Sequence, residues 1–148
     1  MSGGDDTADA GQSDGEDALA QRALEARKSA YAPYSGFSVG AAAVVDGVTY
    51  PGANVENASY GVTICAERTA IAAAVTEGQR RLEAVAVATS SSPPATPCGI
   101  CLQTMLEFAE DPRDVRVILV NPSGERRALS LADLIPHGFV SASLPEGS

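Results

Sequence analysis

The spacing of apolar and polar residues changes several times along the chain, and each change marks the boundary of a predicted element. Apolar residues recur at helical spacing within 17–30, whereas 37–45 and 48–55 have the pattern of two strands joined by a tight turn at Asp46-Gly47. The rest of the chain predicts, in order, helix 62–78, strand 82–89, loop 90–97, helix 98–110, strand 115–120, a short strand at 126–129 and a last short helix from Ser130.

Two local patterns add detail to this order. Ser130 and Asp133 have the spacing of a capping box at the start of the last helix. The segment between Cys65 and Cys98 is long enough for a helix, a strand and a loop, which is the content of a β-α-β crossover. Strands that flank these two cysteines can therefore be parallel.

The candidate chemistry lies in three cysteines, the only ones in the chain, and one glutamate. Three thiolates fill three positions of a tetrahedral zinc site and leave the fourth for water, as catalytic zinc sites do. Both cysteine motifs are predicted at helix N-termini, where the helix dipole and free N–H groups favour the thiolate. Glu67 is placed to exchange protons with that water, which is the pattern of the zinc nucleobase deaminases. The two motifs are Cys65-Ala66-Glu67 and Pro97-Cys98-Gly99-Ile100-Cys101.

Other interpretations of these residues remain open at this point. A lone Cys-x-x-Cys also occurs as half of a structural zinc site or as a redox pair. Unpaired cysteines can also be ordinary core residues, because a free thiol packs as a small apolar group. Glu67 taken alone would be a solvated helix residue, but its place between Cys65 and Arg68 favours the catalytic interpretation.

Charge and length refine the domain organisation. The 148 residues suffice for one domain, and the net charge of −9 is concentrated at the start, where residues 1–17 carry six acids and neither Lys nor Arg. We therefore expect a disordered acidic tail over 1–16 and a single domain over 17–148. The chain shows no basic stripe, no apolar run of membrane length and no secretory signal, so we expect neither nucleic-acid nor membrane binding, and a reducing cytoplasm as the compartment.

Beyond the zinc motif, several sequence blocks resemble the cytidine deaminase family, in its small form with one zinc per subunit. The resemblance covers roughly residues 19–144, and its blocks occur in the family's order and at family-like spacing. Those blocks are Tyr31-Ala-Pro-Tyr-Ser-x-Phe37-x-Val-Gly-Ala, Asn54-Val-Glu56-Asn-Ala58-Ser-Tyr60, Cys65-Ala-Glu67-Arg-Thr-Ala, Pro97-Cys-Gly-x-Cys101 and Leu134-Ile-Pro-x-x-Phe139.

The resemblance implies a role for each part of these blocks. Zinc would be bound by Cys65, Cys98 and Cys101, with Glu67 as the proton shuttle and Arg68 offsetting the charge of the thiolates. The substrate residues would be Phe37 packed on the pyrimidine, Asn54 and Glu56 on the ribose, and the backbone around Ala66 on the base edge. The resemblance also implies a homotetramer, in which Ala58, Tyr60 and Phe139 would complete a neighbouring subunit's pocket.

With this resemblance, we expect a three-layer α/β/α sandwich around a mixed five-stranded sheet. The expected reaction is the zinc-dependent hydrolysis of cytidine and 2′-deoxycytidine to uridine and 2′-deoxyuridine with release of ammonia, in pyrimidine salvage. A deaminase of a related nucleoside or nucleoside antibiotic is the alternative enzyme, and a non-catalytic zinc-binding interaction module is the alternative from another class. A deaminase of nucleic-acid polymers is disfavoured, because such a channel requires basic and aromatic residues.

The chain departs from the family at one position beside the zinc motif. Leu102 follows the last cysteine, where the family usually has arginine. Three thiolates around Zn²⁺ carry one excess negative charge, which that arginine and Arg68 can offset by hydrogen-bonding the sulfurs. The departure therefore concerns the acidity of the zinc site more than the type of reaction.

Overall fold

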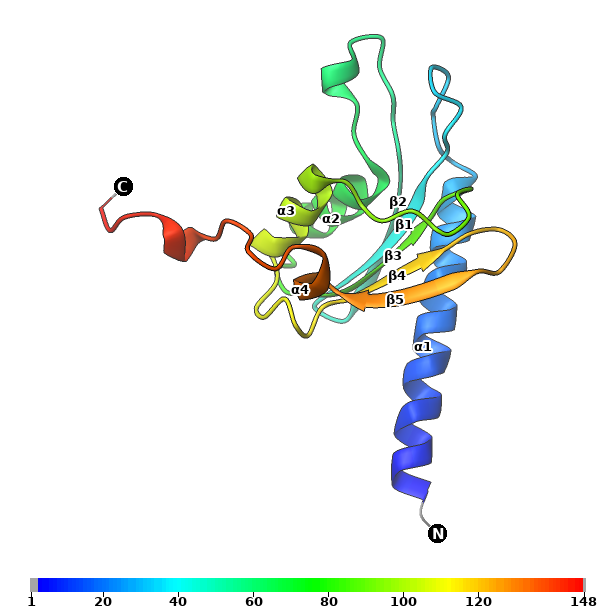
Figure 1. The fold of residues 1–148 in the computed structure, drawn as a ribbon, viewed down its shortest axis with the longest axis vertical. Helices are drawn as coiled ribbons and strands as arrows, with labels where there is room; N and C mark the ends of the chain where they lie inside the picture. The colour runs from blue at the N-terminus through cyan, green and yellow to red at the C-terminus, as the bar shows by residue number, and fades with distance from the viewer. Residues whose placement is uncertain (1–2, 148) are drawn as a thin grey trace.

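A computed structural model describes residues 3–147, with side chains from residue 15 onward, as a three-layer α/β/α sandwich around a five-stranded sheet (Figure 1). This confirms the expected fold. The strands are β1 (Gly40–Val45), β2 (Val48–Ala53), β3 (Leu82–Ala88), β4 (Arg116–Val120) and β5 (Arg126–Ser130). The helices are α1 (Gly3–Arg27), α2 (Ala66–Thr76), α3 (Gly99–Glu107) and α4 (Leu131–Leu134), with short 3₁₀ turns at Tyr60–Val62 and Ser141–Ser143.

The sheet is mixed, with the strand order β2-β1-β3-β4-β5. β1 is antiparallel to both of its neighbours, β3 and β4 are parallel, and β5 is antiparallel to β4. A parallel pair requires a crossover connection, and here α3 makes the connection between β3 and β4. The parallel pair therefore lies beside the cysteines, but its crossover runs through α3 after Cys98 and not through the segment between Cys65 and Cys98, whose helix α2 joins β2 and β3, two strands separated by β1. Asp46 and Gly47, which join β1 to β2, both have positive φ angles (48° and 77°), as a tight hairpin turn requires.

Side chains alternate between the two faces of the sheet and separate two packed layers. The face toward α1 presents small residues such as Ala42 and Ala86, which pack with Leu19 and Ala23 of that helix. The opposite face presents larger residues such as Val87 and Leu119, which pack in one cluster with side chains of α2 and α3. α2 and α3 therefore lie on the same face of the sheet, and Figure 1 shows α1 on the other.

The helix α1 extends through most of the segment predicted as a tail. It begins at Gly3, whereas residues 1 and 2 lie outside the described residues. Glu16, the last residue of the predicted tail, forms an ion pair of 3.0 Å with Arg116 on β4, and the next residue, Asp17, pairs with Arg126 on β5. The division at residues 16 and 17 stays a prediction. Across residues 3–147, no helix has the combination of length and apolar character needed to cross a membrane.

One glycine sets how closely α2 approaches the sheet. A Cβ atom added to Gly52 on β2 would lie 2.5 Å from both the Ala66 carbonyl oxygen and the Ala70 backbone nitrogen. Real Cβ atoms do not approach backbone atoms this closely, so the helix would have to move. Because Ala66 lies between Cys65 and Glu67, Gly52 fixes the start of α2 where the candidate chemistry is located.

We expect Gly52→Ala to lower the free energy of unfolding by about 1–3 kcal/mol or more. The added methyl group would clash with backbone atoms, and no flexible side chain is there to move aside. Urea unfolding followed by circular dichroism measures this effect. Gly15→Ala in α1 is the matched control, since an added Cβ there meets nothing within 4 Å and alanine favours a helix. Equal midpoints for the two variants would contradict the close approach at Gly52.

Candidate active site

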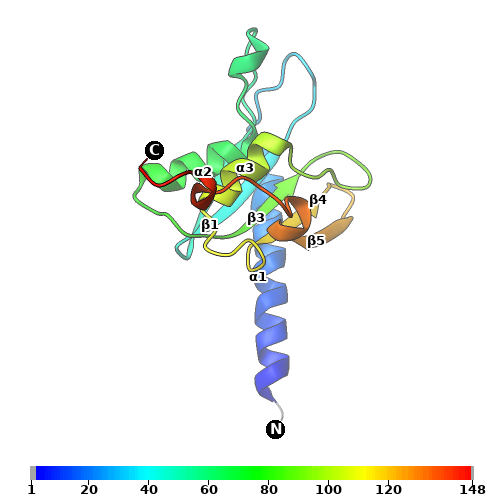
Figure 2. The same cartoon turned by 60° about the vertical axis from the view of Figure 1, so that its left-hand side comes forward.

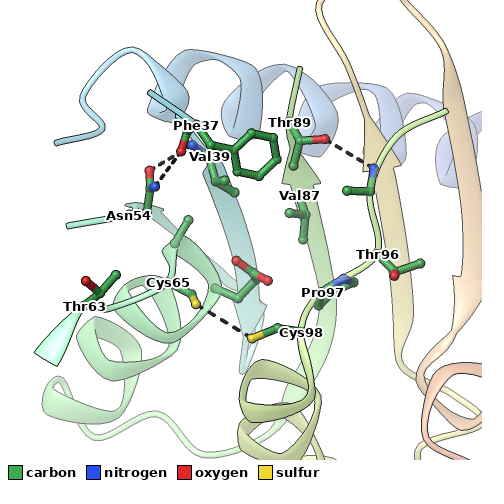
Figure 3. A pocket seen from close by; sticks show the side chains of 13 residues that line it. Phe37, Val39, Asn54, Thr63, Cys65, Val87, Thr89, Thr96, Pro97 and Cys98 are labelled. Carbon is green, nitrogen blue, oxygen red and sulfur yellow. Dashed lines mark hydrogen bonds between the residues drawn. The ribbon is translucent and has the colours of Figure 1, made fainter. Parts of the chain in front are cut away.

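The three cysteines meet where α2 and α3 begin. Cys65 is the N-cap residue of α2, Cys98 is the N-cap residue of α3, and Cys101 lies in the first turn of α3. Their Sγ atoms all lie within 4.8 Å of one another, and those of Cys65 and Cys98 are 3.8 Å apart. Figure 3 shows these last two sulfur atoms facing each other from the two helix starts. The predicted placement of both motifs at helix N-termini is confirmed.

The local backbone leaves the cysteine side chains free to bind a metal. Cys65 and Cys98 have extended φ and ψ angles, and neither side chain makes the usual capping hydrogen bond to its helix. Their carbonyl oxygens still accept the first helical N–H groups, from Thr69 and Leu102 at 3.0 Å each. Each cysteine therefore begins a helix through its backbone while its sulfur points to the common cluster.

The donor set fits zinc in both chemistry and spacing. Zinc binds thiolate sulfur at about 2.3 Å in tetrahedral geometry, which places neighbouring sulfur atoms about 3.8 Å apart. The Cys65–Cys98 separation of 3.8 Å equals this value, and the third sulfur is close enough to join them with a small adjustment. Three cysteine ligands leave one position of a tetrahedral ion without a ligand from the cluster, as in catalytic zinc sites.

Proton sharing within the cluster already favours one thiolate. The pKa of Cys65 falls to about 5, because the Cys101 thiol hydrogen-bonds to it and the Arg68 guanidinium lies nearby, although burial opposes the shift. The pKa of Cys101 is raised by the same hydrogen bond to Cys65 and by burial. The cluster thus holds negative charge at neutral pH, which is the form that binds a metal ion.

Glu67 is a buried carboxylic acid beside this cluster, with only 4% of its surface exposed. Burial raises the pKa of its carboxyl group above the ordinary value, and the negative charge of Cys65 adds to that effect. A raised pKa makes a carboxyl group a better proton acceptor than an ordinary surface carboxylate. Glu67 therefore has the environment of a general acid–base group rather than that of a solvated helix residue.

A cavity of about 200 Å³ opens beside the cysteines and Glu67. Six of the residues singled out from the sequence line it: Phe37, Asn54, Cys65, Ala66, Glu67 and Cys98. The sequence analysis assigned no role to the other lining residues, which are Val39, Thr63, Val87, Thr89, Ala95, Thr96 and Pro97. These are apolar or hydroxyl side chains, and only Val39 and Pro97 stand within the sequence blocks quoted above. Figure 3 shows the Phe37 ring extending over the cavity from the segment before β1.

Glu56 does not line this cavity within one chain. Its carboxylate accepts the backbone N–H groups of Tyr34 and Ser35 at 2.9 and 3.1 Å and the Ser35 hydroxyl. These hydrogen bonds hold the pKa of Glu56 below its ordinary value. The residue lines an adjoining hollow of about 360 Å³ with Tyr34, Ser35, Tyr60 and Thr63.

The three residues expected to serve a neighbouring subunit lie outside the cavity. Tyr60 is 75% exposed and Phe139 is 58% exposed, which is unusual for aromatic side chains, and Ala58 is exposed beside Tyr60. The loop with Tyr60 stands at the end of the molecule opposite the N-terminus of α1 in both ribbon views (Figure 2). Gln103 of α3 donates a 2.8 Å hydrogen bond to the Phe139 carbonyl oxygen, which attaches the C-terminal segment to α3.

Arg68 links the cysteine cluster to the loop that precedes α2. Its Nη2 atom lies 3.0 Å from the Thr63 carbonyl oxygen and 3.9 Å from the Cys65 sulfur. Its Nε atom is buried without a hydrogen-bond partner among the described residues. Leu102 is half-buried and packs against the core cluster under α2 and α3. Arg68 is therefore the guanidinium in contact with the sulfurs, while position 102 contributes apolar packing.

Comparisons with known proteins agree with this geometry. The family model for the cytidine and deoxycytidylate deaminase zinc-binding region matches residues 14–118. The cytidine deaminase of Halalkalibacterium halodurans is 44% identical over 127 residues, which cover 85% of this chain and 95% of that protein. A crystal structure of cytidine deaminase from Burkholderia pseudomallei superposes with a TM-score of 0.78 at 47% identity, covering 82% of this chain and 97% of the other. That from Mycobacterium tuberculosis superposes with a TM-score of 0.71 at 40% identity over 83% and 95%. The chain belongs to the cytidine deaminase family.

Proposed function

We propose that this protein hydrolyses cytidine and 2′-deoxycytidine to uridine and 2′-deoxyuridine and releases ammonia. The observation that carries the proposal is the position of Glu67, a buried carboxylic acid in the wall of a cavity that is also lined by Cys65 and Cys98, two of the three clustered cysteines. The membership of the chain in the cytidine deaminase family supports the same reaction. Pyrimidine salvage in a reducing cytoplasm, where thiolate ligands persist, is the setting that we infer for it.

Different residues of the chain would bind the metal and transfer the protons in this reaction. Zinc held by Cys65, Cys98 and Cys101 would supply a Lewis acid that makes water nucleophilic near neutral pH. Glu67 takes a proton from the attacking water and gives it to ring atom N3, while the water oxygen forms a bond to C4. The carboxylate then takes the remaining proton from the new C4 hydroxyl group and gives it to the amino group, which leaves as ammonia as the C4–N bond breaks and the C4 carbonyl forms. Each transfer uses the raised pKa of Glu67.

Substrate recognition is proposed for residues on two sides of the cavity. Phe37 would pack on the pyrimidine ring, and the backbone around Ala66 would hydrogen-bond the base edge. Asn54 and Glu56 would hold the ribose, although the Glu56 carboxylate is engaged by Tyr34 and Ser35 in the single chain. Ribose contact by Glu56 therefore requires that it share or exchange these hydrogen bonds.

The direct test is incubation of the purified, zinc-loaded protein with cytidine and measurement of uridine and ammonia. We expect equal amounts of both products. A related nucleoside with an altered sugar is assayed in parallel. Faster turnover of cytidine indicates an ordinary cytidine deaminase, whereas faster turnover of the altered nucleoside indicates an enzyme for nucleoside antibiotics. A zinc-loaded and folded protein that forms no uridine from cytidine or 2′-deoxycytidine would refute the proposal.

We also infer a homotetramer in which neighbouring chains complete each cavity. The support is the exposure of the Tyr60 and Phe139 rings, together with the apolar surface that Val62, Ile100 and Leu144 leave uncovered in one chain. In such an assembly, Ala58, Tyr60 and Phe139 would contribute to a neighbour's site.

This arrangement predicts recovery of activity from two damaged variants. Glu67→Gln removes the proton shuttle, and Phe139→Ala removes a side chain proposed to act in the neighbouring chain. When the two are unfolded and refolded together, some Glu67-containing sites receive Phe139 from the other variant. We expect the mixture to be several-fold more active than the average of the two refolded separately. Activity equal to that average, in mixtures whose mass confirms mixed assembly, would argue against a shared site.

A further inference from the structure

Asn54 directly follows β2, at the point where the chain stops pairing with β1 and begins to pair with Tyr31 and Ile64. The antiparallel register of β1 and β2 ends at the pair Gly40 and Ala53. One residue later, the Asn54 carbonyl oxygen accepts the Tyr31 N–H at 2.9 Å, so it is no longer available to the segment before β1. Val55 then bridges to Tyr31 and Ile64 instead. The Val39 N–H therefore loses the backbone acceptor that continued pairing with Asn54 would supply.

The Asn54 side chain supplies the missing partner. Its Oδ1 atom accepts the Val39 N–H at 2.9 Å, and its Nδ2 atom donates to the Phe37 carbonyl oxygen at 2.8 Å (Figure 3). Its backbone N–H also donates to the Val39 carbonyl oxygen at 3.2 Å. The amide thus imitates one peptide unit of a neighbouring strand, with a donor and an acceptor in the right order. With 7% of its surface exposed, Asn54 makes these hydrogen bonds largely shielded from water.

We propose that Asn54 is a positioning residue that holds the Phe37 ring over the substrate base, separately from any contact with the sugar. This inference rests on the proposed function, because it assigns Phe37 to the base. Phe37 is 38% exposed and lines the cavity together with Val39, so few side-chain contacts of its own hold the ring in place. The amide retains a second N–H and a second lone pair for a ribose hydroxyl, so the two roles are compatible.

The kinetic test compares two substrates that differ only in the sugar. Asn54→Ala removes both side-chain hydrogen bonds, and we expect kcat/KM to fall about tenfold or more. With 2′,3′-dideoxycytidine, which lacks the 2′- and 3′-hydroxyls, a positioning role predicts that most of this loss remains. A loss seen with cytidine but absent with dideoxycytidine would assign Asn54 to the ribose alone and overturn the inference. In a Phe37→Ala background, Asn54→Ala should have a much smaller effect, because the ring it positions is gone.

A second measurement does not depend on catalysis. The chain contains no tryptophan and four tyrosines, so Phe37→Trp introduces a single tryptophan at the ring position, which can be excited selectively as the reporter. Adding Asn54→Ala should increase quenching by acrylamide at least twofold, because the ring leaves its fixed position. Unchanged quenching would overturn the inference. If wild-type protein fails to deaminate cytidine, the proposed function fails, while this measurement still decides whether Asn54 positions residue 37.

Two further variants guard against a general loss of structure. Asn121→Ala is the control, because Asn121 is another buried asparagine whose amide bonds backbone groups of Ser91 and Glu125 at 3.0 Å each, outside the cavity lining. It should lower the melting temperature without raising the quenching of residue 37. Asn54→Asp serves if Asn54→Ala does not fold, since it keeps the acceptor for Val39 but loses the donor to Phe37. It should show the same rise in quenching and the same loss with dideoxycytidine, and the absence of both would count against positioning.

Discussion

Replacing Glu67 by glutamine should reduce kcat with cytidine by about 10²- to 10⁴-fold or more, while the protein remains folded and keeps its zinc. Glutamine has nearly the same shape but neither accepts nor releases a proton in this range, and general acid–base catalysis is worth about this factor. Because the carboxyl group is proposed to transfer protons at more than one step, the loss can exceed the usual range. Steady-state kinetics measures the loss, and elemental analysis of the same sample measures the zinc content.

The matched control for this variant lies on the same helix. Glu77, the C-cap residue of α2, accepts a 2.8 Å hydrogen bond from the Tyr50 hydroxyl and does not line the cavity. Glu77→Gln removes one carboxylate charge near α2 while leaving the proton shuttle intact, so we expect near-normal kcat. Near-normal turnover in Glu67→Gln, or an equal loss in both variants, would show that Glu67 is not the group that transfers protons.

Removal of zinc is the second change with a large expected effect. Every cysteine of the chain belongs to the cluster, so a thiol count reports directly on metal binding. Zinc-loaded protein should show one zinc per chain and almost no reactive thiol, even at Cys98, whose side chain is exposed. After chelation, three thiols should react with a thiol reagent and activity should fall at least about 100-fold, because the Lewis acid is lost.

Activity should return when zinc is added back before the thiols are modified, but not with magnesium, which prefers oxygen ligands. Alanine in place of Cys98 should lower the zinc content and the activity together. A zinc-loaded sample in which Cys98 reacts as quickly as in the chelated sample would contradict its role as a ligand. Full activity in protein shown to contain no zinc would contradict the metal's part in the reaction.

Strong local patterns were sufficient to predict most of the fold. The Asp46-Gly47 turn, the capping box of Ser130 and Asp133, and the helix starts at both cysteine motifs are confirmed by the structure. Each of these features depends on interactions between residues that are close in the sequence, so the local sequence is enough to predict it. The cysteine cluster could also be predicted, because three thiols and a nearby acid have few combined uses in one small domain.

Features set by contacts between distant segments were predicted less well. The strand predicted over 37–45 begins only at Gly40, because Asn54 pairs with residues 37–39 through its side chain. The helix predicted over 62–78 begins only at Ala66, because Ile64 bridges to Val55. Cavity residues such as Thr89 and Ala95 belong to no recognisable motif. They reach the site only because the loop after β3 folds back and hydrogen-bonds to Thr89. No local pattern encodes these long-range pairings.

The placement of the ligands on two separate helices also has a consequence for the unfolded chain. Cys65 and Cys98 are 33 positions apart, so an ion that stays bound to both closes a long loop. Closing a loop of this length removes about 3 kcal/mol of conformational freedom from the unfolded ensemble. The native protein has already fixed these positions and loses nothing further. The same ion that serves the reaction would thereby act as a reversible crosslink, and refolding would begin from a chain whose two ligand-bearing segments are already joined.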